Sequence, residues 1–224
     1  MSNALRVTLS SLVSLAVFVA LLFWPAGTVD YWQGWTFLAV FAVASLVPIL
    51  FLNRIDPAVV ERRMHGGPTA EPRLVQKVVV IGIIGCFAGI LVLSGLDRRF
   101  GWSQVPAWLA VLGAVMVAVG LGIAMLVVYQ NRYAAANIVV EDQQKLVTTG
   151  LYGMVRHPMY SGSVIMIIGM PLALGSYWAL IPAIVSLLLL VIRTVDEETM
   201  LRQELPGYCD YMAGVRYRLI PLIW

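Results

Sequence analysis

The sequence predicts an all-α, polytopic integral membrane protein with about five to six transmembrane segments, the last two forming a helical hairpin. Two observations on composition carry this prediction: 60% of the 224 residues are hydrophobic and 12% are charged. The mean hydropathy of +0.86 agrees with them. Soluble domains are typically about half apolar and a quarter charged. The composition therefore excludes a globular protein with a hydrated surface.

The apolar blocks give the expected helices in chain order. Between the second and third blocks, a short interfacial helix is expected over 56–64, because Asp56 suits an N-cap and Pro57 the first helical position. We interpret the first block as a retained helix rather than a signal peptide, because the region after it lacks a clean pair of small residues. The four blocks of membrane length cover about residues 9–24, 34–52, 75–96 and 107–129.

A last apolar block runs from about residue 159 to 195 and breaks near Gly175. Its two parts form either two spans or a hairpin that enters the bilayer and returns. Both alternatives put residues 158 and 195 on the same side of the membrane. We therefore divide the chain into an N-terminal transmembrane region, 1–129, and a region that carries the polar chemistry, 130–224.

The charge distribution predicts the orientation. If the N-terminus is inside, all of the 15 lysines and arginines except Arg98 and Arg99 fall on inner segments. The positive-inside rule then places both termini in the cytoplasm, and a bacterial inner membrane is the expected location. No basic run or aromatic-basic patch accompanies the net charge of +3, so no nucleic-acid partner is expected. Two cysteines cannot build a disulfide framework, and two histidines leave little for a metal site.

Polar residues gather after residue 130, on the predicted inner side. Arg156 and His157 stand at the mouth of the fifth apolar segment, where Pro158 suits the first turn of a helix. A helix start offers free backbone N–H groups and a partial positive charge, which can seat an anion. The alternative is that Arg156 and His157 anchor the helix to lipid headgroups.

The other end of the same block carries a second polar group. Arg193 and Glu197 are four residues apart and share one helix face, so they could form a simple ion pair. However, both ends of the block return to the same side, and charged groups that converge at a membrane boundary predict a functional site. The residues expected to face one another are Arg156, His157 and Tyr160 on one side, and Arg193, Asp196 and Glu197 on the other.

Taken in order, these motifs resemble the isoprenylcysteine carboxyl methyltransferases and their bacterial homologues, integral membrane enzymes that use S-adenosylmethionine. The resemblance covers about residues 130–221. It departs at Leu205-Pro206-Gly207, where relatives often have Phe-Gly and where we expect the last long helix to break. The matching residues are Leu146-Val147-Thr148-Thr149-Gly150-Leu151-Tyr152, Arg156-His157-Pro158-Met159-Tyr160, Glu197-Glu198, and Tyr208 with Tyr211.

The resemblance implies a cytoplasmic-face cofactor pocket and assigns roles within it. Arg193 would be the arginine that meets the substrate, and Arg156 would join it as a catalytic residue. Glu197 would anchor S-adenosylmethionine. The residues implied to line the adenosine end of the cofactor are Gln144, Lys145, Leu146 and Val147. Those implied to hold its remainder are Tyr152, His157, Pro158, Met159 and Tyr160.

The acceptor is expected to be lipophilic, foremost the carboxylate of a prenylcysteine-type substrate, with a smaller lipidic acid, a thiol or an amine left open. A carboxylate is already ionised at pH 7 and needs an arginine to hold it rather than a base. A thiol would need deprotonation, for which His157 is the nearby candidate.

Two other functions compete with methyl transfer. One is an NADPH-dependent membrane reductase of similar helical layout, and the other is a non-catalytic membrane scaffold or small transporter. The sequence predicts contact with membrane lipids and does not predict an oligomeric state.

Overall fold

The computed structural model describes residues 3–64, 71–133 and 145–224, and in these ranges the chain forms helices and turns without a β-strand. The predicted all-α class is confirmed. The helices are α1 (Asn3–Ala26), α2 (Trp32–Ile55), α3 (Pro57–Met64), α4 (Leu74–Phe100), α5 (Ala107–Gln130), the 3₁₀ turn η2 (Gly150–Gly153), α6 (Pro158–Ala173), α7 (Leu180–Glu204) and α8 (Tyr208–Gly214).

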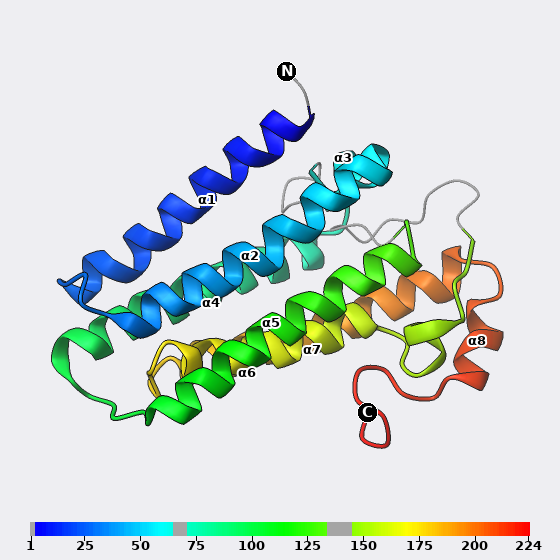
Figure 1. Ribbon diagram of the computed structural model, residues 1–224. Helices are drawn as coiled ribbons and strands as arrows, with labels where there is room; N and C mark the ends of the chain where they lie inside the picture. Colours follow the sequence, from blue (N-terminus) through cyan, green and yellow to red (C-terminus); the bar gives the residue numbers. More distant parts are fainter. Residues whose placement is uncertain (1–2, 65–70, 134–144) are drawn as a thin grey trace.

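Four of the described helices are long and apolar enough to cross a membrane, namely α1 from Thr8 onward, α2, α4 and α5. Helix α6 is apolar but has 16 residues. Helix α7 has 25 residues and becomes polar from Arg193 onward. These lengths agree with a polytopic helical bundle whose last two long helices form a hairpin (Figure 1).

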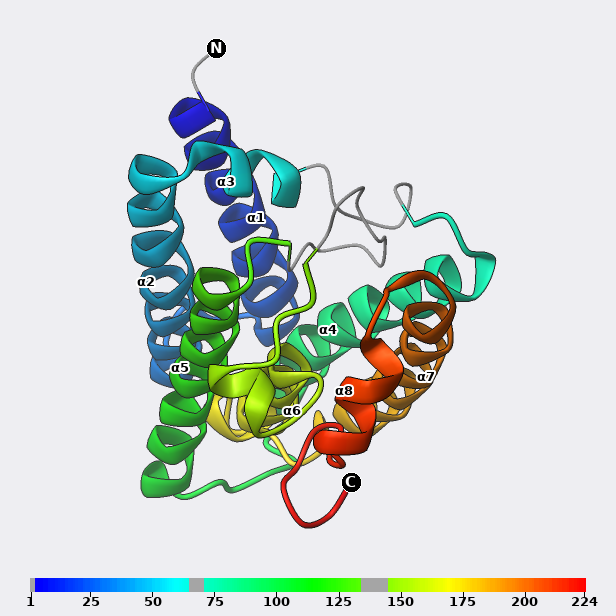
Figure 2. The same ribbon diagram turned by 90° about the vertical axis from the view of Figure 1, so that its right-hand side faces the viewer.

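The long helices alternate in direction (Figure 1), and they pack as a ring in the order α1, α4, α7, α6, α5, α2 (Figure 2). Helices α2, α5 and α7 end at one end of the bundle, where α4 and α6 begin. We call this the site end. Figure 2 views the molecule from the site end, where α3 and α8 also lie.

The predicted boundaries follow from local residue chemistry. Helix α3 begins at Pro57, as expected for proline at a first helical position. The α6–α7 turn contains Gly175 at φ +71° and α7 is followed by Gly207 at φ +82°, a left-handed conformation that glycine adopts without steric cost. The break near Gly175 and the helix end before Gly207 are thus both confirmed.

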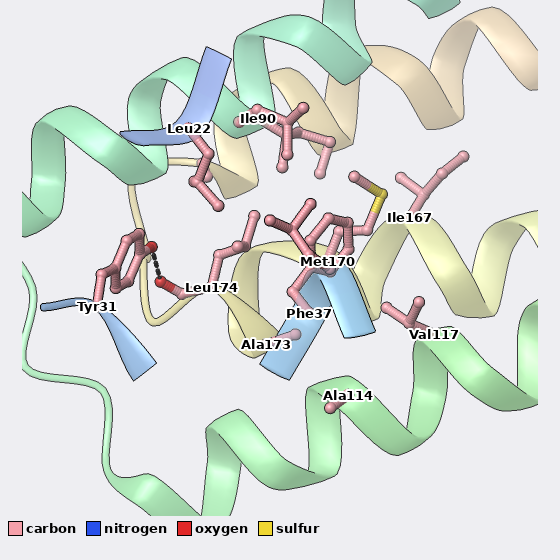
Figure 3. Close-up of a cluster of buried hydrophobic side chains, with 14 of the residues drawn as sticks. Leu22, Tyr31, Phe37, Ile90, Ala114, Val117, Ile167, Met170, Ala173 and Leu174 are labelled. Atoms are coloured by element: carbon pink, nitrogen blue, oxygen red, sulfur yellow. Dashed lines mark hydrogen bonds between the residues drawn. The ribbon is translucent and has the colours of Figure 1, made fainter. Parts of the chain in front are cut away.

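One hydrophobic core joins the two predicted regions of the chain. Its buried side chains come from α1, α2, α4, α5, α6 and α7, so the region 1–129 and the region 130–224 share it (Figure 3). The hydroxyl of Tyr31, between α1 and α2, donates to the carbonyl of Leu174 at the end of α6. The central members include Leu22, Phe37, Ile90, Val117 and Met170.

Helices α5 and α6 approach each other most closely at glycines. A methyl group built on Gly162 would lie 2.6 Å from the carbonyl oxygen of Gly120, and one on Gly169 would lie 2.8 Å from that of Gly113. Such contacts are far shorter than van der Waals separation, so these positions admit no side chain without movement of a backbone. Small residues at membrane helix interfaces permit this kind of close packing.

A buried carboxylate fastens the opposite end of the bundle. Asp97, near the end of α4, accepts hydrogen bonds from the backbone N–H of Ser103 at 2.7 Å and from its hydroxyl at 2.6 Å. The hydroxyl of Ser176 also donates to Asp97, at 2.5 Å. These bonds join α4, the α4–α5 loop and the α6–α7 turn, so they hold the turn of the hairpin against α4.

Candidate active site

The start of α6 and the polar half of α7 meet at the hydroxyl of Tyr160. This hydroxyl donates to the carboxylate of Glu197 at 2.5 Å and accepts from Nε of Arg193 at 3.0 Å. The predicted convergence of the two ends of the hairpin is therefore confirmed. The simple ion pair between Arg193 and Glu197 is not formed, because the phenol hydroxyl of Tyr160 lies between the two groups.

Arg193 is buried in a polar group that also involves the start of α4. Its Nη1 donates to Oε1 of Gln76 at 2.8 Å, and its Nη2 donates to Oε1 of Glu71 at 2.9 Å. Glu71 and Gln76 are themselves almost completely buried. Arg193 is thus a buried guanidinium neutralised by Glu71 rather than one half of an ion pair on the helix surface.

Asp196 lies elsewhere than predicted. Its carboxylate accepts from the side-chain amide of Gln76 and pairs with Arg73 at 2.7 Å. It therefore faces the start of α4 instead of His157 and Tyr160. The reason is helical geometry: Asp196 precedes Glu197 by one residue, which turns the two side chains about 100° apart on α7.

Arg156 also contacts a different partner from the one expected. Its Nε donates to Oε1 of Glu198 at 2.7 Å, and its Nη1 donates to the carbonyl oxygens of Val215 at 2.9 Å and Arg216 at 2.7 Å. Arg156 therefore binds the last turns of α7 and the segment after α8. Arg193 and Arg156 lie in separate polar groups joined through α7.

Glu198 is the centre of this second group. Its carboxylate receives Nε of Arg218 at 2.9 Å as well as Arg156, and it lies 3.4 Å from Nε2 of His157. Burial by itself would raise the pKa of Glu198. The hydrogen bonds from His157, Arg156 and Arg218 outweigh burial and lower the pKa to about 2. Glu198 is therefore a carboxylate at every ordinary pH.

The segment after α8 covers the start of α6. The backbone N–H of Arg156 donates to the carbonyl of Tyr217, and that of His157 donates to the carbonyl of Arg218, both at 2.9 Å. The hydroxyl of Ser161 donates to the carbonyl of Leu219 at 2.5 Å. The backbone N–H of His157, at the N-cap of α6, is thus already bonded within the chain and does not serve as part of an anion seat.

Several residues that the resemblance assigns to the cofactor surround Glu197. Nδ1 of His157 lies 3.8 Å from its carboxylate, and the rings of His157 and Tyr160 stack with centroids 5.6 Å apart. Burial raises the pKa of Tyr152, the negative charge of Glu197 adds to this rise, and a hydrogen bond from Asn131 opposes it. His157, Tyr160 and Glu197 therefore form one neighbourhood, while the hydroxyl of Tyr152 is bonded to Asn131 at the end of α5.

The remaining cofactor residues lie around that neighbourhood in different environments. Leu146 packs with the cluster of Leu205, Tyr208 and Tyr211, and Met159 packs with a cluster from α2, α3 and α5. Pro158 is buried at the first position of α6, Lys145 is exposed, and Val147 is half-buried. Gln144 lies outside the described residues.

An apolar cavity of about 240 Å³ opens beside Arg193, between α4, α6 and α7. Arg193 and Tyr160 give it a polar end, while aliphatic and aromatic side chains form most of its wall. Ile84 in that wall is 54% exposed, so the cavity reaches the outer surface of the bundle. The apolar wall includes Val80, Ile84, Phe87, Ile90 and Leu190.

Comparison with known proteins finds a family similar to part of the chain. Residues 108–205, a little under half of the sequence, match the phospholipid methyltransferase family. This region of the chain is therefore similar to that family. The phospholipid methyltransferase match begins in α5 and ends just after α7, so it contains Tyr160, Arg193, Glu197 and Glu198. Together with the apolar helices, it supports a multi-pass membrane methyltransferase.

One curated protein is similar over part of the chain. Alkane 1-monooxygenase 2 of Pseudomonas aeruginosa is 28% identical over 114 residues, which are 48% of this chain and 29% of that protein. The chain thus spans less than a third of this relative's length. The monooxygenase activity in the name of this relative is a property of that protein.

Three residues of the polar groups escaped prediction from the sequence. Glu198 was visible as half of a Glu-Glu pair, yet the pattern could not tell which glutamate points to which partner. Gln76 left a weak signal, as a polar side chain just inside an apolar block. Glu71 lies before that block and gave no signal, because its proximity to Arg193 arises from the packing of α4 against α7.

Proposed function

We propose that the chain transfers a methyl group from S-adenosylmethionine to a lipophilic acceptor whose polar end is held at Arg193. The observation that carries this proposal is the hydroxyl of Tyr160, which contacts Glu197 on one side and Arg193 on the other. Methyl transfer requires donor and acceptor to be held side by side, and orientation alone supplies much of the acceleration. Because the Tyr160 hydroxyl contacts both residues, a cofactor held at Glu197 and an acceptor held at Arg193 would lie next to each other.

The residues around Glu197 fit the cofactor. Among the described residues, no lysine or arginine forms an ion pair with Glu197, and its side chain is 21% exposed. A carboxylate with this access suits the positive charges of S-adenosylmethionine, and the stacked rings of His157 and Tyr160 offer an aromatic surface. When bound, S-adenosylmethionine supplies the methyl group. Glu197, Tyr152, His157 and Tyr160 would hold it.

The cavity beside Arg193 fits the acceptor. Its apolar wall suits a prenyl or acyl chain, and its exposed margin at Ile84 lets such a chain enter sideways from the bilayer. Arg193 at the polar end suits a carboxylate, as in an isoprenylcysteine-like substrate, because a guanidinium offsets the cost of removing that charge from water. A related lipidic acid fits the same features, while a thiol or amine would use the cavity without needing the arginine.

The family match favours methyl transfer over the two competing functions. A nicotinamide-dependent reductase would need a site for a phosphorylated dinucleotide. The group around Glu197 supplies a carboxylate, which repels phosphate. A non-catalytic scaffold has no need of the buried polar group at Arg193, and burying charged groups costs stability.

A titration with S-adenosylhomocysteine tests the proposal. The purified protein should bind it and gain thermal stability by ligand linkage, while NADPH should leave the melting curve unchanged. Glu197→Gln should weaken binding by about 1.5–3 kcal/mol, the usual range for a charged hydrogen bond. Glu204→Gln, an exposed glutamate on the same helix, serves as the matched control. If the folded wild-type protein does not bind S-adenosylhomocysteine, the proposal is refuted.

A further inference from the structure

Each nitrogen of the Arg193 guanidinium already has an acceptor from the chain. Nε faces the hydroxyl of Tyr160 at 3.0 Å, Nη1 faces Gln76 at 2.8 Å, and Nη2 faces Glu71 at 2.9 Å. Arginine holds a carboxylate best through two parallel N–H donors. The pair of donors Nη1 and Nη2 is occupied by Gln76 and Glu71. In the pair that includes Nε, the Nε donor is occupied by Tyr160.

The two acceptors on the Nη edge differ in charge. The side-chain amide of Gln76 donates to Asp196, which is paired in turn with Arg73, so the oxygen of Gln76 is fixed toward Arg193. Glu71 presents a carboxylate oxygen to Nη2, which is the group and the distance that an acceptor carboxylate would offer. Of the two, Glu71 is therefore the group whose charge and position on Arg193 an acceptor carboxylate would reproduce.

We propose that Glu71 is a specificity-determining residue that occupies, on Arg193, the position of the acceptor carboxylate. The proposal rests on the proposed function, in which Arg193 holds the acceptor. An anionic acceptor binds by exchange, as its carboxylate takes Nη2 and Glu71 withdraws. Without an acceptor, Glu71 neutralises a buried guanidinium that would otherwise be costly to keep in an apolar surrounding.

The exchange makes affinity depend on the charge of the acceptor. An anionic acceptor brings a second carboxylate to a guanidinium that already has one, and like charges in a buried site repel each other strongly. An uncharged ligand of the same shape meets no such cost because it need not displace Glu71. The strength of the contact between Glu71 and Arg193 therefore sets how readily the site accepts a carboxylate.

The test compares two ligands on two proteins. The ligands are N-acetyl-S-farnesylcysteine and its methyl ester, and binding to the full chain in nanodiscs is measured without cofactor, so no methyl transfer is needed. Glu71→Gln keeps an oxygen for Nη2 but removes the charge. It should bind the carboxylate at least about tenfold more tightly than wild type and the ester equally well. Glu204→Gln is the control and should match wild type for both ligands.

Each outcome decides the matter. Unchanged or weaker binding of the carboxylate by folded Glu71→Gln overturns the proposal, as does equal tightening for acid and ester. If Glu71→Gln fails to fold, Glu71→Asp replaces it, since the shorter side chain keeps the charge but loosens the contact. Glu71→Asp should then bind the carboxylate several-fold more tightly, and unchanged binding overturns the proposal. Failure of the proposed function would show separately, as loss of S-adenosylhomocysteine binding by wild type.

Discussion

Arg156 and Glu198 form a buried ion pair, with Nε of Arg156 2.7 Å from Oε1 of Glu198. The pair connects the segment just before α6 to the last turns of α7, and the other bonds of Arg156 reach the segment after α8. It therefore holds the frame in which Tyr160 meets Arg193 and Glu197. Its role is to position the site, whereas Arg193 and Glu197 face the proposed ligands.

Loss of the Glu198 carboxylate should destabilise the whole frame. Glu198→Ala removes the carboxylate that pairs with the buried guanidinium of Arg156, and removal of one partner from a buried pair costs about 3–5 kcal/mol. Thermal unfolding in detergent should show a clear fall in Tm. Glu204→Ala removes an exposed carboxylate from the same helix and should leave Tm nearly unchanged. Equal Tm values for the two variants would contradict the role of Glu198.

Stability should fall in acid through the same residue. The pKa of Glu198 is lowered from 4.5 to about 2 in the folded protein, so the folded state favours the charged carboxylate. Its stabilising contribution is fully present above pH 4.5 and is lost as the pH falls from 4.5 toward 2. Tm measured between pH 6 and pH 3 should therefore decrease. The decrease should be smaller in Glu198→Gln, and an equal decrease would assign it to other groups.

The close contact of α5 and α6 should not tolerate a side chain at Gly120. A Cβ there would collide with the backbone of Gly162, so Gly120→Val should cost about 1–3 kcal/mol or more, as overpacking of a tight core does. Gly122 lies two residues along α5, with no atom within 4 Å of a Cβ built there. Gly122→Val is thus the control. Thermal unfolding of both variants makes the comparison, and similar losses would indicate a general effect of valine.

Substitution of Arg193 should separate acceptor binding from cofactor binding. Arg193→Lys keeps a positive charge but lacks the planar fork, so methyl transfer to a carboxylate acceptor should fall well below wild type. Affinity for S-adenosylhomocysteine should stay within about twofold, because Arg193 faces the cavity rather than the exposed side of Glu197. Arg193→Ala should reduce transfer further. Full activity in Arg193→Ala would remove Arg193 from the acceptor site.

Topology reporters should place the site end on the cytoplasmic side. A reporter after Trp224 and one near Gln143 should both be cytoplasmic, whereas one near Ser103 should be periplasmic. The expectation follows from the lysines and arginines, which crowd the inner segments and leave Arg98 and Arg99 outside. A periplasmic reporter near Gln143 would separate the site from a cytosolic cofactor.

The sequence by itself determined the helices, their breaks and the two polar ends of the hairpin. Apolar length predicted the long helices, and glycine and proline predicted the turn near Gly175 and the break before Gly207, because these are properties of the local chain. The motif order predicted that Tyr160, Arg193 and Glu197 share a site. The matched family supports the same chemistry.

Only the tertiary structure decided the partner of each charge. Glu197 and Glu198 are adjacent in sequence, but one meets Tyr160 and the other meets Arg156, because one residue turns a side chain by about 100° around α7. Glu71 reaches Arg193 across more than 120 residues because α4 packs on α7. Contacts of this kind depend on the register between helices, and that register is fixed by packing such as Gly120 against Gly162 rather than by any local pattern.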